Sequence, residues 1–223
     1  MYRAQNVLNA SEAADFIVQA GMLPFLRCGI DGFSLQDHVP QGWFESDDHE
    51  LNPWYWRYSF ALDDQIAYGK FFNRKLGFVA KELFADFVNV KRNGRAAQQF
   101  FEDGLISGEA YRLYESFFPG AVKSSLELRE DLGLKRSVLD RALAELMNET
   151  LIVILDFQQR IGRYGCPYGW PIAYYGKPEE EFGEELVFCH RTKAQSWSRL
   201  MRSAHKIAQI QDENQMLKVL GIH

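Results

Sequence analysis

The sequence predicts an α+β protein with a central winged helix-turn-helix, flanked by N-terminal helix and β-hairpin elements and by C-terminal helices. Two observations carry this prediction. Between residues 107 and 148, three short segments have apolar residues at helical spacing, and capping or breaking residues bound them. From residue 150 the pattern changes to two short apolar runs around a glycine-rich loop, which is typical of a strand, a wing and a returning strand.

Local signals mark the ends of the three predicted helices. The first helix begins at Ser107. Ser124 and Glu127 have the spacing of a capping box, in which each side chain accepts a hydrogen bond from the backbone N–H of the other residue. This pair predicts the start of a second helix that ends at Gly133. A third helix follows from about Ser137, with its apolar side chains on one face.

The two runs after residue 150 differ in character from the helices before them. Residues 151–157 are rich in β-branched side chains, which favours a strand. The returning run, residues 170–175, contains Pro171, which cannot donate to a strand ladder and suits an edge strand. Residues 158–169 between them contain glycines, arginines and tyrosines, and we interpret this loop as the wing.

The predicted motif directs several basic side chains toward a nucleic acid. In helix-turn-helix proteins the start of the second motif helix faces the major groove, and basic side chains elsewhere contact phosphates. The residues that we expect to bind nucleic acid are Lys135, Arg136, Arg141, Arg160, Arg163 and Tyr164. The alternative is that Arg141 pairs with Glu145 along its helix and the wing is an ordinary hairpin. Winged helices also serve as protein-interaction modules, because a fold does not fix a function.

Composition limits the function classes. The chain has 223 residues, enough for one domain or two small ones, and a formal net charge of −5. Proteins that bind phosphate backbones are more often basic overall, so the charge counts against DNA binding but permits a local basic patch. We expect three regions: an aromatic-rich N-terminal region packed on the core (residues 1–106), the winged helix (107–177) and C-terminal helices (178–223).

Neither cofactor nor metal motifs occur in the sequence. Cys28, Cys166 and Cys189 lack the CxxC spacing of a structural zinc site, so we expect no metal and no cofactor. The sequence contains no P-loop, dinucleotide fingerprint or known hydrolase motif, and no catalytic residue is assigned. No secretory signal pattern or long apolar run is present, so we expect a cytoplasmic protein that does not bind membranes.

The flanking regions contain further predicted elements. Their approximate bounds are a helix at 11–19 capped by Ser11, a hairpin of residues 66–72 and 76–79, a helix at 80–88, a helix at 194–209 and a short helix after Asp212.

An aromatic cluster and a set of basic residues are candidate site residues in the N-terminal region. Aromatic rings next to an arginine can stack on bases, but large aromatic side chains more often anchor a core, and we favour packing. Lys70, Arg74 and Arg92 could form one positive surface beside the wing. The alternative for Arg92 is that it complements the dipole at the end of its helix. The candidate pocket or basic-surface residues are Trp54, Trp56, Arg57, Lys70, Arg74 and Arg92.

Several short segments carry a resemblance to a known family. They are residues 21–25 (Gly-Met-Leu-Pro-Phe), 32–35 (Gly-Phe-Ser-Leu), 53–56 (Pro-Trp-Tyr-Trp), 67–72 (Ala-Tyr-Gly-Lys-Phe-Phe), 77–78 (Gly-Phe) and 167–170 (Pro-Tyr-Gly-Trp). Together they resemble uncharacterised bacterial proteins described as related to the AlkZ-type DNA glycosylases.

This resemblance implies a winged-helix architecture and action on damaged DNA, since those glycosylases excise alkylated or crosslinked bases. They position the attacking water with a Gln-x-Gln or Gln-x-Asp pair near the N-terminal part of the chain. This sequence has Gln36-Asp37 there, without the spacer, and Gln209-Ile210-Gln211 near its C-terminus. We therefore transfer no catalytic residue.

Three functions follow as hypotheses. The leading one is a winged-helix protein that binds or associates with duplex DNA. The second is a glycosylase-like hydrolase that acts on damaged bases, with a base pocket near the tryptophan cluster. The third is a winged-helix module that binds a protein partner. The oligomeric state stays open.

Overall fold

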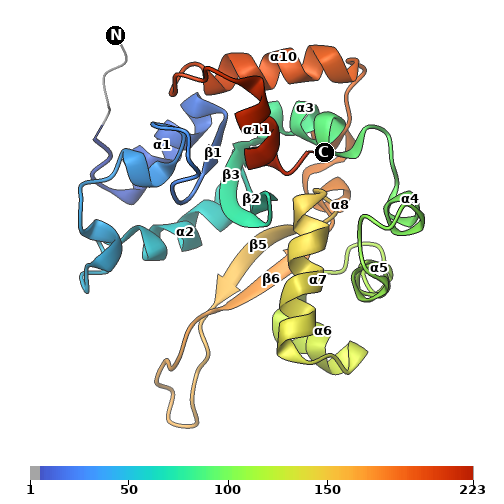
Figure 1. The fold of residues 1–223 in the computed structure, drawn as a ribbon. Coiled ribbons are helices and arrows are strands. Elements are labelled where there is room, and N and C mark those ends of the chain that lie inside the picture. Colours follow the sequence, from blue (N-terminus) through green and yellow to red (C-terminus); the bar gives the residue numbers. More distant parts are fainter. Residues whose placement is uncertain (1–5, 223) are drawn as a thin grey trace.

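The computed structural model describes residues 6–222 and has a mixed α+β fold (Figure 1). Within these residues, the strands form one antiparallel six-stranded sheet in the order β1-β3-β2-β5-β6-β4. The strands are β1 (Met22–Pro24), β2 (Ile66–Phe72), β3 (Lys75–Ala80), β4 (Lys123–Ser124), β5 (Val153–Gln158) and β6 (Ile172–Gly176).

Helices surround this sheet. In chain order they are α1 (Ala10–Ala20), α2 (Pro53–Leu62), α3 (Lys81–Arg92), α4 (Ala97–Glu102), α5 (Gly108–Glu115), α6 (Ser125–Leu132), α7 (Arg136–Asn148), α8 (Pro178–Phe182), α9 (Glu184–Val187), α10 (Lys193–Ala204) and α11 (Glu213–Leu220). Two short 3₁₀ turns cover Leu35–Asp37 and Trp43–Glu45. The helices α1 and α2 pack on the strands, α7 packs on β2, and α10 packs on α3.

The sheet joins the N-terminal and central regions of the chain. In its middle, β2 pairs with β5, and Tyr68 lies opposite Ile154. On the far side of β5 the chain returns as β6, which also pairs with the short strand β4. Residues 66–80 and 153–176 therefore share one ladder, and the apolar core continues from one region into the other.

A glycine pair lets the chain pack closely in the β2–β3 hairpin. Gly69 and Gly77 lie directly opposite each other. A Cβ atom on Gly77 would lie 2.8 Å from the backbone oxygen of Leu23 on β1 and against the Phe72 ring. Since real Cβ atoms do not approach backbone that closely, these three strands need glycine at position 77. The space is filled instead by phenylalanine rings, which dominate the fully buried side chains.

Most of the local start and stop signals are confirmed. Ser107 caps α5, Asp212 caps α11, and Ser124 with Glu127 forms the capping box of α6. Gly133 ends α6 with a positive φ of 63°.

Other predicted bounds differ. Asn9 rather than Ser11 caps α1, because the Asn9 side chain accepts from the N–H of Glu12. The strand predicted at 151–157 begins at Val153, since Thr150 has a positive φ of 60° and turns the chain first. Its partner begins at Ile172, after Pro171. The helix predicted at 80–88 continues to Arg92, and the one predicted at 194–209 ends at Ala204.

Residues 6–222 contain neither a membrane-spanning helix nor a metal-binding cluster. None of the helices there has the length and apolar character needed to cross a bilayer. The same residues do not bring three or more His, Cys, Asp or Glu side chains together in a way that could hold a metal ion.

Candidate nucleic-acid interface

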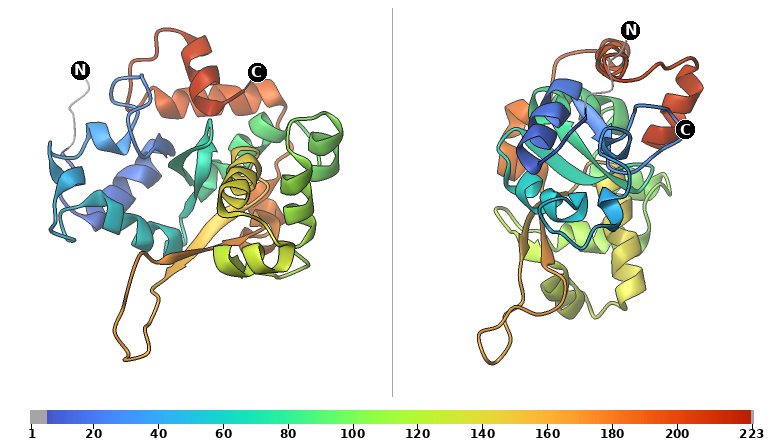
Figure 2. Two further views of the ribbon diagram at one scale, coloured as in Figure 1. Left: turned by 60° about the horizontal axis from the view of Figure 1, so that its bottom comes forward. Right: turned by 90° about the vertical axis from the view of Figure 1, so that its left-hand side faces the viewer.

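The loop between β5 and β6 forms a long arm that projects from the body of the protein (Figures 1 and 2). Its large side chains lie in solvent: Tyr164 is 90% exposed, and Ile161, Tyr168 and Trp170 are more than half exposed. Arg163 is exposed and Arg160 is half-buried. No acidic residue occurs between Asp156 and Glu179, so the arm is positively charged.

Backbone hydrogen bonds give this arm a defined shape. Gly162 donates to the carbonyl of Cys166 at 2.8 Å, and Tyr168 donates to the carbonyl of Arg160 at 3.0 Å. Gly165 has a φ of +76° with open space around it, so its backbone conformation rather than crowding requires glycine there. The arm is therefore a closed hairpin that presents Arg163 and Tyr164 at its end.

The start of α7 lies at the same end of the molecule as the arm (Figures 1 and 2). Lys135 and Arg136 are exposed there, and the Arg136 Nε lies 3.7 Å from an Asp140 carboxylate oxygen one turn later. Arg141 lies within 4.0 Å of two carboxylates, Glu145 on α7 and Glu109 on α5. The pairing along the helix that the sequence suggested for Arg141 and Glu145 is thus present.

A row of aromatic rings connects the base of the arm to α2. Trp170 stacks on Tyr55, with ring centroids 6.3 Å apart, and Tyr55 stacks on His49 at 3.7 Å. The Arg57 guanidinium lies 5.2 Å from the centroids of both Trp54 and Phe157. Such contacts between cations and rings stabilise by about 0.5–2 kcal/mol each. They hold α2 against β5 and fix the direction in which the arm leaves the sheet.

The tryptophans of α2 are used in packing. Trp56 is buried and donates from its indole N–H to the carbonyl of Glu50 at 2.7 Å. Trp54 packs edge-on against Phe25 at 4.8 Å. Both rings thus hold α2 in place.

Burial raises the pKa of two tyrosines in the sheet, one on β2 and one on β6. Tyr68 on β2 is fully buried, and burial raises its pKa to about 12, although the nearby Arg57 opposes the shift. Burial likewise raises the pKa of Tyr175 on β6. Both hydroxyls are therefore harder to ionise than those of tyrosines in solvent.

The other basic candidates lie away from the arm. Arg74 is in the β2–β3 turn, where its backbone N–H donates to Asn148 at the last residue of α7. Because α7 is about 20 Å long, Arg74 lies far from Arg136 at its first residue. Lys70 is half-buried on β2.

Arg92 does not contribute to a basic surface. It is 5% exposed, donates to Thr150 and forms an ion pair with Glu179 of α8. A buried guanidinium needs such partners, because an unpaired charge in the interior is very costly. Arg92 therefore connects α3 to α8 inside the protein.

The two glutamine motifs considered in the sequence lie beside each other in space. Asp37, Gln209 and Gln211 line one open hollow of about 850 Å³ between residues 29–38 and 207–215. The Asp37 carboxylate is already bound, since it accepts from Arg27 at 2.9 Å and from the Ser34 hydroxyl at 2.7 Å.

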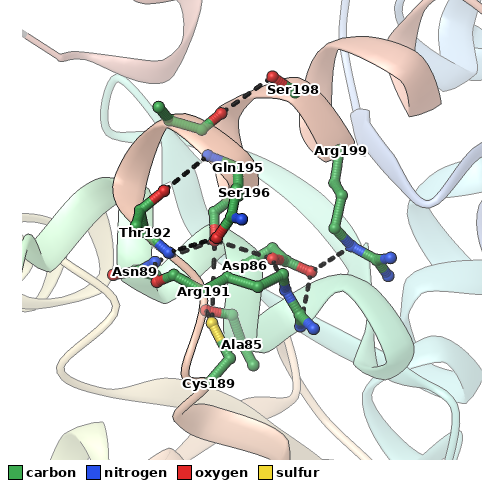
Figure 3. Close-up of polar contacts among 11 residues, drawn as sticks. Ala85, Asp86, Asn89, Cys189, Arg191, Thr192, Gln195, Ser196, Ser198 and Arg199 are labelled. Carbon is green, nitrogen blue, oxygen red and sulfur yellow. Dashed lines mark hydrogen bonds and ion pairs between the residues drawn. The ribbon is translucent and has the colours of Figure 1, made fainter.

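Sequence reasoning missed a polar cluster between α3 and α10. Asp86 is fully buried and binds Arg191 and Arg199 (Figure 3). One signal for it exists in the sequence: Asp86 interrupts the apolar face of α3, which predicts a buried carboxylate that needs a cation.

Comparison with known proteins agrees with this architecture. Among solved structures, the DNA glycosylase AlkZ of Streptomyces sahachiroi is similar in fold, with a TM-score of 0.50 and 10% sequence identity. The match covers 97% of this chain and 60% of that chain, so this chain spans about three-fifths of the length of the glycosylase. Among curated protein sequences, none matches. The family model described as "AlkZ related" matches residues 7–221, and the chain therefore belongs to the AlkZ-related family.

Proposed function

We propose that this protein binds duplex DNA through a winged helix made of residues 107–177. Three features support the winged helix. The elements occur in the order α5, β4, α6, α7, β5 and β6, which is the order of helices and strands in that motif. The first strand, β4, pairs with the last, β6, and the arm between β5 and β6 takes the place of the wing.

The arm is the observation that carries the proposal. It places Arg163 and Tyr164 in solvent, at the end of the molecule where α7 presents Lys135 and Arg136. Arginine and lysine on these two elements would contact phosphates on either side of a groove, and Tyr164 would contact sugars or base edges. Arg141 is a weaker contributor, because two carboxylates already lie near it.

The test is binding to labelled duplex DNA over a series of salt concentrations. The double variant Arg136→Ala/Arg163→Ala should bind about 10- to 100-fold more weakly, and the slope of log K against log salt should fall by about two. Lys193→Ala is the matched control, because this exposed lysine lies on α10 at the opposite end of the molecule. Equal affinity of the double variant and the control would contradict this interface. Absence of binding at low salt would leave the protein-interaction module as the better hypothesis.

A second candidate is glycosylase-like hydrolysis of a damaged base. It is favoured by the hollow that Asp37 shares with Gln209 and Gln211, since carboxylate and amide groups can orient an attacking water. The similarity in fold to a protein named a DNA glycosylase also supports this second hypothesis. Alkylated duplex should then lose its base in the presence of the protein, and Asp37→Asn should slow this release. If the Asp37→Asn variant releases the damaged base at the wild-type rate, Asp37 does not take part in the reaction.

A further inference from the structure

Asp86 on α3 is a fully buried carboxylate that four hydrogen bonds hold in place (Figure 3). Arg191 donates from Nε at 2.5 Å and from Nη2 at 3.1 Å. The Ser196 hydroxyl donates at 2.8 Å and the Arg199 Nε at 2.7 Å. Two cations thus share one carboxylate, and the site keeps an excess of positive charge.

The contact with Asp86 fixes the Arg199 guanidinium but leaves its outer nitrogens free. Only Nε of Arg199 binds Asp86, and Figure 3 shows its two Nη atoms pointing away from the carboxylate. This pair of Nη atoms has the geometry that binds two oxygens of one phosphate. Since the side chain is already ordered, binding there would cost little additional conformational entropy.

Two further cations lie on the same side of this helix. Arg202 is three residues after Arg199 on α10, and Lys206 is seven residues after it, just past the end of the helix, so all three fall on one side. They line one hollow of about 170 Å³ together with Ser203 and Glu82. Within residues 6–222, neither Arg202 nor Lys206 forms an ion pair within 4.0 Å of a carboxylate, and the Lys206 ammonium donates a hydrogen bond to the carbonyl of Gln19 at 3.4 Å.

We propose that this hollow is a phosphate-binding site, in which Arg199, Arg202 and Lys206 bind the phosphate oxygens. The carboxylate of Glu82, which also lines the hollow, would lower the affinity for phosphate, but the three cations leave a net positive charge. The hollow is large enough for a phosphate group. The phosphate can belong to a small molecule or to a nucleic-acid backbone. The site lies on α10, at the end of the molecule opposite the arm, so it is independent of the interface proposed above (Figures 1 and 2).

Calorimetric titration of the protein with inorganic phosphate, at constant ionic strength, tests the site. We expect saturable binding with a dissociation constant in the millimolar range, which corresponds to a binding free energy of about −4 kcal/mol. The double variant Arg202→Ala/Lys206→Ala should bind phosphate about tenfold more weakly or worse. It should keep the fold, because neither side chain is bonded to Asp86. Lys193→Ala, on the other side of the same helix, should bind phosphate as the wild type does. Failure to saturate by about 20 mM phosphate, or equal binding by the double variant, would overturn the proposal.

Two further titrations identify the source of the phosphate. A 5′-phosphorylated mononucleotide that binds more tightly than inorganic phosphate indicates a small-molecule ligand. If Arg202→Ala/Lys206→Ala binds duplex DNA more weakly than the wild type, the phosphate belongs to a nucleic-acid backbone. A further loss of affinity when Arg163→Ala is added would indicate two separate contact surfaces. An acidic peptide that binds this surface while phosphate does not would overturn the proposal in favour of a protein partner.

Discussion

Lys91 of α3 is buried, and its ammonium donates a hydrogen bond to the carbonyl of Leu220 at the end of α11. Burial lowers its pKa from 10.5 to about 8, although Glu149 opposes the shift. Between these pH values the unfolded chain binds more protons than the folded protein, so this group makes stability rise with pH. Below about pH 8 its contribution is constant and unfavourable.

We therefore expect the free energy of unfolding to depend on pH differently in wild type and Lys91→Met. From pH 7 to about pH 9.5, the wild type should gain about 2 kcal/mol relative to the variant. Urea unfolding at both pH values measures this difference. The control variant Lys193→Met, at an exposed position, should show the same pH dependence of the unfolding free energy as the wild type. Parallel pH dependence of wild type and Lys91→Met would show that Lys91 titrates normally in the folded protein.

Residue identity alone does not reveal which charges are buried. Arg92 follows a lysine at the end of a predicted helix, so its local pattern favours a basic surface, whereas the apolar residues around Asp86 already indicate that its carboxylate is buried. Their burial depends on partners more than 80 positions away, Glu179 for Arg92 and both Arg191 and Arg199 for Asp86. Lys135, Arg136 and Arg163 could be identified as exposed because their local patterns already put them at a helix start or in a loop.

At the scale of elements, the α6 capping box makes a testable contribution. The Ser124 N–H donates to Glu127 at 2.8 Å, and the Glu127 N–H donates to the Ser124 hydroxyl at 3.2 Å. These bonds to Ser124 also lower the pKa of the Glu127 carboxyl. Ser124→Ala should lower the free energy of unfolding by about 1 kcal/mol, measured by chemical denaturation. Ser125→Ala, one position later and without a capping bond, should change it by much less.

Elements with local start signals were predicted well, and those defined by distant contacts were not. The caps at Ser107, Ser124 and Asp212 each need only the next few residues. The helix α2 was missed, because its aromatic residues favour strands in general, whereas Asn52 and Pro53 start a helix. The strands β1 and β4 have three and two residues and exist only through pairing with β3 and β6, so no local pattern marks them.

At the scale of the whole molecule, the shared sheet should make residues 6–222 unfold together. Ile154 on β5 is buried and pairs with Tyr68 in the N-terminal region and with Tyr175 on β6. Ile154→Ala should cost about 3 kcal/mol. Because this loss falls on a strand common to both regions, the unfolding midpoint should fall by the same amount whether it is followed by tryptophan fluorescence or by far-ultraviolet circular dichroism. Three of the five tryptophans lie in residues 43–56, so separate transitions would show that the N-terminal region unfolds by itself.

The two outer strands of the sheet, β1 and β4, are very short, and they contain Pro24 and Lys123 respectively. A long, flat outer strand offers unpaired backbone groups on which a second chain can add a strand, and this is a common start of aggregation. Here a proline that lacks an N–H and a charged lysine stand where such growth would begin. Copies of the protein at high concentration should therefore stay separate rather than join through their sheets.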